Sequence, residues 1–158
     1  MGTNVGGNQT VSGNLTVDGD IISDGGISTQ STIIAQGNMY APDFVQTSDY
    51  RVKNFIKQIL PDEALKAILN LNPITFEYKN IPGIFHDGFF AHEVQNQIEN
   101  AVHGNKDEYY QGQQPKYQHL SYLMLIPWLV GAIQKQQEII QKLEDKLNKS
   151  NKLAEVSV

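Results

Sequence analysis

Hydrophobic and polar positions change period twice along this chain, and the first stretch has the shortest repeats. In residues 1–47, β-branched pieces alternate with glycine turns, and Gly13-Asn14, Gly19-Asp20 and Gly37-Asn38 each precede a short apolar piece. Strands this short cannot bury a core alone, so they must stack on neighbouring chains or on repeats of themselves. The pattern predicts a β-rich fibre stalk end, a triple-stranded β-helix in which three chains wind together. The alternative is a disordered linker, but the regular Val/Ile/Leu spacing favours the stalk.

Residues 48–119 have the pattern of a small α+β domain. Apolar residues from Val52 to Leu60 recur at i, i+3, i+4, i+7 and i+8, which predicts an amphipathic helix with Ser48 at its N-cap. A second helix is expected from Pro61 to the stop at Asn72-Pro73. The further expected elements are a strand at 74–78, a turn at 81–83, a strand at 88–91, a short helix at 92–98, and a loop at 100–118 with a short strand near 108–110.

Residues 120–158 have the heptad pattern of a long helix that forms a coiled-coil arm. Ser121 can cap this helix, and Pro127 is tolerated in its first turn. One seam of the repeat carries Ile126, Ile133, Ile140 and Leu147, and the complementary seam carries Leu129, Gln136, Leu143 and Ser150. The alternative is a single amphipathic helix packed on its own domain.

Charge changes sharply where the first two stretches meet. Residues 1–47 hold four aspartates and no Lys, Arg or His, whereas the remainder holds all twelve cations. A break of this kind marks a module boundary. The net charge of −5 argues against a nucleic-acid partner. The longest apolar run, Leu123 to Val130, is far below the roughly 20 residues that span a bilayer. We therefore expect a soluble protein with no membrane partner.

Candidate chemistry is sparse outside this boundary. The chain has no cysteine, and the four histidines, His86, His92, His103 and His119, have no metal-ligand spacing, so we expect no metal and no cofactor. Nothing in the sequence brings the carboxylates of Glu77 and Glu93 together. The start of the chain is polar and glycine-rich, so we expect no signal peptide, and we expect the chain to be the C-terminal end of a longer protein. The tyrosines at 109, 110, 117 and 122 are expected at an interface or in the core.

Four motifs in order carry a resemblance to a known family. They are Ser48-Asp49-x-Arg51-x-Lys53 before an apolar helix, Leu71-Asn72-Pro73 leading into Phe76-Glu77-Tyr78-Lys79, Gly88-Phe89-Phe90-Ala91-His92-Glu93-Val94-Gln95, and Tyr122 leading through Leu125-Ile126-Pro127 to Ala132-Ile133-Gln134. Residues 47–150 thereby resemble the intramolecular chaperone domain at the C-terminus of phage endosialidase tailspikes, tail fibres and neck-appendage proteins. A related domain occurs in a eukaryotic membrane-tethered transcription factor. At the position of His92 the family usually has Gln.

The resemblance implies a function and names its residues. The domain would form a homotrimer, fold the upstream β-fibre segment as its client, and release itself as a single-turnover self-cleaving serine peptidase. Carried over by position, Ser48 is the nucleophile and Lys53 the base of a serine–lysine dyad. Asp49, Arg51 and His92 are supporting residues. The chain would be the precursor of a virion component, made in the host cytoplasm, with the chaperone part released after cleavage.

The dyad makes a chemical demand on Lys53. A serine hydroxyl is a poor nucleophile at neutral pH and needs a base beside it. A lysine can serve only when neutral, so its pKa must fall from about 10.4 towards 7–8 through burial or nearby positive charge. Arg51 is a cation that favours such a fall. Asp49 opposes it unless it pairs with Arg51.

Spacing leaves the partner of Lys53 open. On a regular helix or strand, positions 48 and 53 point to different faces. Either residues 48–50 turn back ahead of the helix, or Lys53 acts on the serine of a neighbouring chain. Attack by Ser48 on the preceding carbonyl would break Thr47–Ser48. Cleavage of Ser48–Asp49 is harder, because it would need a strained four-membered ring.

Two other functions compete with self-cleavage. In a non-cleaving structural trimerisation tip, Ser48 would be only a helix cap. In a receptor-binding fibre tip, the C-terminal piece would bind a host surface. The sequence therefore predicts a trimeric α+β domain between a β-helical stalk and a coiled-coil helix, with self-cleavage as the leading function.

Overall fold

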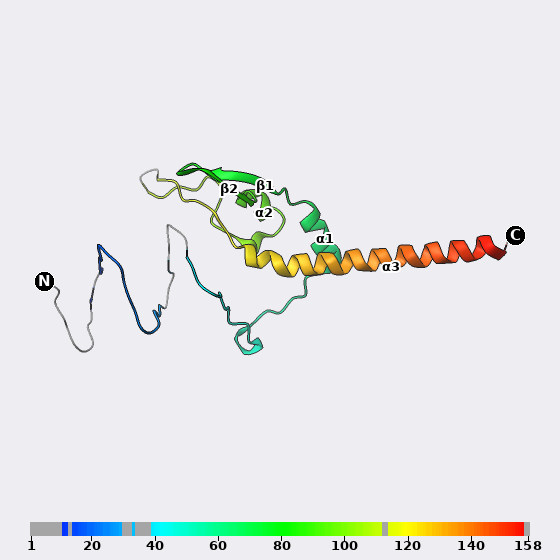
Figure 1. Ribbon diagram of the computed structural model, residues 1–158, viewed down its shortest axis with the longest axis horizontal. Helices are drawn as coiled ribbons and strands as arrows, with labels where there is room; N and C mark the ends of the chain where they lie inside the picture. The colour runs from blue at the N-terminus through cyan, green and yellow to red at the C-terminus, as the bar shows by residue number, and fades with distance from the viewer. Residues whose placement is uncertain (1–10, 13, 30–32, 34–38, 112–113, 157–158) are drawn as a thin grey trace. The chain divides into compact units, whose positions relative to one another are not determined.

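The structure is a computed structural model that describes residues 11–12, 14–29, 33, 39–111 and 114–156 (Figure 1). The chain divides into two compact units, Met1–Asp49 and Tyr50–Val158. No described residue of the first unit lies in a helix or a strand, and its apolar side chains, such as Ile22 at 87% exposure, face solvent. One chain thus does not form the predicted strands in its described residues. The β-helical stalk stays a prediction, and the part at 34–38, which includes Gly37-Asn38, lies outside the described residues.

The second unit is a small α+β domain followed by a long helix, as the sequence predicts. Two of its elements, α1 and α3, pack against each other, and two antiparallel strand pairs, β1–β2 and β3–β4, are joined by short helical turns. The order is a 3₁₀ turn at Tyr50–Val52, α1 at Pro61–Leu69, β1 at Ile74–Tyr78, β2 at Ile81–Gly88, α2 at Ala91–Gln95, a 3₁₀ turn at Glu99–Ala101, β3 at Val102–His103, β4 at His119–Leu120, a 3₁₀ turn at Tyr122–Leu125 and α3 at Ile126–Val156.

The amphipathic helix predicted between Val52 and Leu60 is wrong for this structure. After the 3₁₀ turn the chain has no regular secondary structure until α1, and Phe55 adopts a left-handed conformation with φ 58°. A helix this short is marginal unless its apolar face packs against something. Pro61 also prevents continuation into α1, because Leu60 is extended at φ −72°, ψ 133°.

Helix α1 begins where its sequence signals predict, but its buried residues are small ones. Pro61 occupies the first turn, where its missing N–H costs nothing, and Asp62 and Glu63 place negative charge near the positive end of the helix dipole. The buried face carries Ala64 and Ala67. These small side chains let α1 approach α3 closely, and Figure 1 shows α1 against the first half of α3.

The β1–β2 hairpin confirms the strand predicted at 74–78 but not the two elements predicted after it. The turn lies at Lys79-Asn80, so the turn predicted at 81–83 and the strand predicted at 88–91 are wrong. Strand β2 includes Pro82-Gly83 because the pairing register shifts beside Tyr78. The strand is irregular at this point, where Gly83 adopts φ +86°. The side chain of Glu77 accepts a hydrogen bond from the Gly83 N–H at 2.8 Å and holds this irregularity.

The core lies where α1, α2, the second 3₁₀ turn and the start of the last helical segment meet. Its buried members come from several elements, so it forms only when the segments around it assemble. They are Ala67, Val94, Ile98, Ala101, Val102 and Leu125, with Trp128 and Phe89 among the partly buried residues around them. The short helix predicted at 92–98 is present as α2, ending earlier at Gln95. In the region predicted as a short strand near 108–110, Tyr109 forms an isolated bridge with Pro115.

Helix α3 has two faces with different surroundings. Gly131 and Ala132 are buried on the side that meets the domain. The heptad positions face away from it: Ile133 is 62% exposed and Leu147 is 61% exposed, and Ile126, Leu129, Ile140 and Leu143 are exposed as well. The described part of the domain therefore does not cover the heptad seam, which argues against a helix packed only on its own domain. Among the described helices, none combines the length and the apolar character needed to cross a membrane.

Candidate functional site

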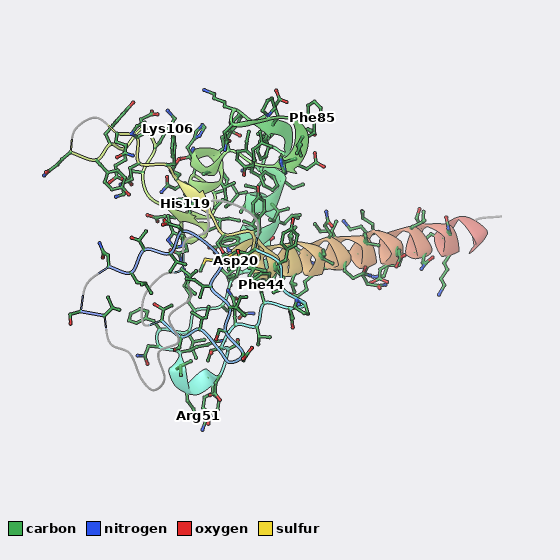
Figure 2. The ribbon with its side chains drawn as sticks, turned by 60° about the vertical axis from the view of Figure 1, so that its left-hand side comes forward. Asp20, Phe44, Arg51, Phe85, Lys106 and His119 are labelled. Atoms are coloured by element: carbon green, nitrogen blue, oxygen red, sulfur yellow. The ribbon has the colours of Figure 1, made fainter. Side chains whose placement is uncertain are left out.

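The junction around Ser48 is an open stretch of chain that ends in a tight turn. Ser48 is exposed, and Asp49 is half-buried. The 3₁₀ turn at Tyr50–Val52 comes next, and the Lys53 N–H closes it by donating a hydrogen bond to the Tyr50 carbonyl at 3.2 Å. Figure 2 shows Arg51 projecting outward from this turn. No α-helix begins directly after Ser48, so the α-helix that Ser48 is predicted to cap is absent here, and the 3₁₀ turn takes its place.

The division between the two compact units falls inside this junction. Ser48 belongs to the unit that ends at Asp49, and Lys53 belongs to the unit that begins at Tyr50. The pairing of the two side chains therefore stays a prediction. Side chains at positions 48 and 53 would point to different faces only on a regular helix or strand. Because the backbone here is irregular, this geometric objection to a contact between Ser48 and Lys53 does not apply.

The supporting residues proposed from the sequence lie in two places. Arg51 is in the 3₁₀ turn, next to the junction. His92 lies on the first turn of α2, half-buried, with its ring centroid 5.7 Å from that of Phe90. The contribution of Asp49, Arg51 and His92 to cleavage stays a prediction.

The remaining histidines have structural surroundings. His86 packs against Phe76 and Tyr78, with ring centroids 5.8 and 5.2 Å away. His103 and His119 are opposite each other across β3–β4. Among the described residues, no cluster of three or more His, Asp or Glu side chains could hold a metal ion.

An aromatic groove of about 950 Å³ runs between β1 and the segment that leads into the last helix. Two of its lining residues, Phe76 and Tyr122, lie close to Gly88: a Cβ added to Gly88 would lie 2.2 Å from the Tyr122 hydroxyl oxygen and 3.1 Å from Phe76 Cε1. Glycine is therefore required for Tyr122 to reach this place. The groove is lined by Ile74, Phe76, Tyr78, Phe89, Phe90, Tyr117, His119 and Tyr122, among others. The sequence predicted interface or core for Tyr117 and Tyr122, and both line this groove.

An ionic network fixes α1 to α3. It thereby also fixes the C-terminal end of the junction segment, which we define as residues 50–60. Lys135 lies 2.9 Å from Asp62 and 3.1 Å from Glu138. The Asp62 carboxylate, with a smaller effect from that of Glu138, raises the pKa of Lys135 above its usual value. Lys142, with a smaller effect from Lys135, lowers the pKa of Glu138. Sequence periodicity carries no signal for this contact, because Asp62 and Lys135 are far apart in the chain.

A second ion pair stabilises the long loop before β4. The Lys116 ammonium donates to the Glu108 carboxylate at 2.7 Å, and both side chains are about one-third exposed. The hydrogen bond with Lys116, together with the Asn105 N–H, lowers the pKa of Glu108, and the same carboxylate raises the pKa of Lys116. This pair connects the two sides of the Tyr109–Pro115 bridge.

Comparison with known protein families gives a match over part of the chain. Residues 48–103 match the model of a family described as chaperone of endosialidase, a model that is itself named as a peptidase. The match begins at Ser48 and covers the junction, α1, the hairpin, α2 and β3. No curated protein matches the chain.

Proposed function

We propose that the chain is a C-terminal intramolecular chaperone, because residues 48–103 match the family described as chaperone of endosialidase. It trimerises, folds the phage fibre or appendage segment ahead of it, and then releases itself by cleavage beside Ser48. The observation that carries this proposal is that the family match begins at the predicted nucleophile, where the charge of the chain also changes.

The exposed heptad seam of α3 supports trimerisation. A row of isoleucine and leucine side chains at this spacing is the surface that coiled coils bury between chains. Ile133 and Leu147 are each more than half exposed in the single chain. Burying such side chains is worth about 1.5–3 kcal/mol each, so the exposed seam favours association of several chains through α3.

The entropy cost of bringing the chains together explains why the chaperone domain would fold before the fibre. A β stalk with few local contacts loses a large entropy of chain association before its long-range contacts form. A helix and a compact domain can align the chains first. Removing them afterwards deletes the easiest route to unfolding, so the stalk becomes kinetically trapped.

Self-cleavage proceeds by transfer of an acyl group within the junction. The Ser48 hydroxyl adds to the Thr47 carbonyl carbon while the neutral Lys53 amine accepts the hydroxyl proton. The C–N bond between Thr47 and Ser48 then breaks, the Ser48 nitrogen takes up that proton, and an ester joins the two parts. Water hydrolyses the ester, which leaves a carboxylate on Thr47, a free amine on Ser48 and the original hydroxyl.

Gel electrophoresis and intact mass of the purified full chain test this function. Wild type is expected to give two fragments after boiling in detergent, with Ser48 at the new N-terminus. The variants Ser48→Ala and Lys53→Ala are expected to stay whole. Lys57→Ala is the matched control, because Lys57 is an exposed lysine of the same segment, and it should cleave like wild type. An uncut wild-type chain would favour the non-cleaving tip, and a fragment beginning at Asp49 would move the scissile bond.

Mixing two inactive chains decides whether Lys53 acts on its own serine. Chains carrying Ser48→Ala and chains carrying Lys53→Ala are refolded together. If Lys53 acts on a neighbouring chain, mixed trimers cut the chains that retain Ser48. Absence of cleavage in mixed trimers would exclude action between chains.

A further inference from the structure

The junction segment presents an apolar surface that the described part of its own chain leaves exposed. Val52 is 67% exposed, Ile56 is 83% exposed, and Phe55 is fully exposed. In a helical conformation these three residues would share one face, which is the pattern that predicts a helix in the sequence. The same segment carries Arg51, Lys53 and Lys57 and no carboxylate. Exposed valine, phenylalanine and isoleucine side chains that a helix would place on one face are typical of a surface that a partner covers.

The C-terminal end of this segment is fixed on α3. A Cβ added to Gly131 would lie 4.0 Å from Pro61 Cα and 2.8 Å from Ala64 Cβ. The Asp62–Lys135 ion pair of 2.9 Å holds the same end of α1. The C-terminal end of the exposed apolar segment therefore lies next to the turn of α3 that carries Gly131, in the first heptad.

That first heptad has an apolar position that the later ones lack. With Ile126 and Ile133 at a, the e position is Val130, which is 48% exposed, whereas in the next two heptads it is Gln137 and Glu144. The α1 contact lies on the other side of the helix, where Gly131 at f and Ala132 at g are buried. On its e flank, α3 is thus apolar at Val130, near the place where the junction segment is attached, and polar at Gln137 and Glu144. On the g flank, Ile139 is 40% exposed, one heptad beyond Ala132.

Parallel coiled-coil geometry brings these two features together between chains. In such an assembly the e flank of one helix lies beside the g flank of the next. The junction segment leaves α1 on the side of α3 that includes Gly131 at f and Ala132 at g, which are both already buried on their own chain. In the first heptad, the exposed apolar flank that would lie beside this side is the e flank of the neighbouring chain.

We propose that residues 52–60 dock as a helix on the α3 flank of a neighbouring copy, around Leu129, Val130 and Ile133. This inference rests on the proposed trimer. The docking supplies the packing partner without which a helix of this length does not form. Each junction, including Lys53, is then ordered by a second copy, so the segment takes its functional conformation only after assembly.

Cysteine cross-linking between chains tests the docking, since the chain has no cysteine of its own. All chains carry Ser48→Ala so that they stay whole. Chains with Phe55→Cys are refolded with chains carrying Val130→Cys and then oxidised, and the mixed disulfide is identified by mass spectrometry. Asn54→Cys is the matched control, because Asn54 would lie on the opposite face of the helix. We expect at least a several-fold higher yield for Phe55→Cys than for Asn54→Cys.

Ile56→Cys provides a second apolar probe in case the loss of the Phe55 ring weakens docking. Equal yields from the apolar and polar positions, or no mixed disulfide from either Phe55→Cys or Ile56→Cys in assembled chains, would overturn the docking. Sedimentation of the same samples separates this result from a failure of the proposed function. Trimers without the cross-link refute the docking alone, whereas monomers refute the trimer and the docking together.

Discussion

Replacing Gly131 by alanine tests the close approach of α1 and α3. The added Cβ would lie 2.8 Å from the Cβ of Ala64, a residue with no solvent exposure. Non-bonded carbon atoms prefer about 3.5–4.0 Å. Since the Ala64 methyl is bonded directly to the backbone, α1 itself must move away by about 1 Å. The substitution therefore disturbs the contact that fixes the end of the junction segment.

The sign of the change in the free energy of unfolding distinguishes overpacking from helix propensity as the main effect of Gly131→Ala. Alanine in place of glycine inside a helix favours folding by about 1 kcal/mol. Overpacking of a buried contact costs about 1–3 kcal/mol. We expect Gly131→Ala to lower the free energy of unfolding by about 0–2 kcal/mol, whereas propensity alone predicts a gain. Adding Ala64→Gly removes the facing methyl, and the two substitutions should couple favourably by about 0.5–3 kcal/mol.

Urea unfolding of Ser48→Ala chains at one fixed protein concentration measures these differences, because association changes apparent stability. Gln134→Ala, on the exposed side of the same helix, is the control for propensity and should stay within about 0.5 kcal/mol of its parent. A higher urea midpoint for Gly131→Ala, or strictly additive effects of the two substitutions, would refute the close approach.

Two further predictions concern the groove and the loop. Gly88→Ala should lower the free energy of unfolding by about 1–3 kcal/mol, because the new methyl displaces the Tyr122 hydroxyl; adding Tyr122→Phe should recover part of the loss, and a neutral Gly88→Ala would contradict the crowding. For the loop pair, the lowered pKa of Glu108 gives stability that is lost as pH falls below about 4.5, and the raised pKa of Lys116 gives stability that is lost as pH rises above about 10.5. The stability difference between wild type and Lys116→Gln should therefore be largest between these values and shrink with added salt, and a difference that is independent of pH would contradict the pairing.

The elements that could be predicted from the sequence are those whose signals lie within the element. Helix α1 begins at a proline, as predicted. Strand β1 alternates over its whole length and has the predicted bounds. Helix α3 carries a heptad repeat that needs no partner to be recognised. Local pattern and local structure agree in these cases because neighbouring residues decide both.

The elements that could not be predicted depend on contacts with distant residues. Pro82-Gly83 has the composition of a turn, but the hydrogen bond from Gly83 to Glu77 keeps it inside β2. The β3–β4 pair joins residues on either side of a long loop. The segment from Val52 to Leu60 has a helical pattern and no described surface of its own chain to pack on, so the pattern describes a preference that the single chain does not satisfy.

The same reasoning applies to the candidate site. The identities of Ser48 and Lys53 can be proposed from the sequence because the motif is local, but their geometry depends on what orders the segment between the stalk and α1. That segment is attached to α3, the helix whose free seam is suited to bind further copies of the chain. One face of α3 thus positions the end of the junction, and another face is the one proposed to join the chains. If α3 joins the chains and cleavage requires the junction to be ordered, the reaction depends on assembly without any separate sensor, because the same helix also positions the reactive segment.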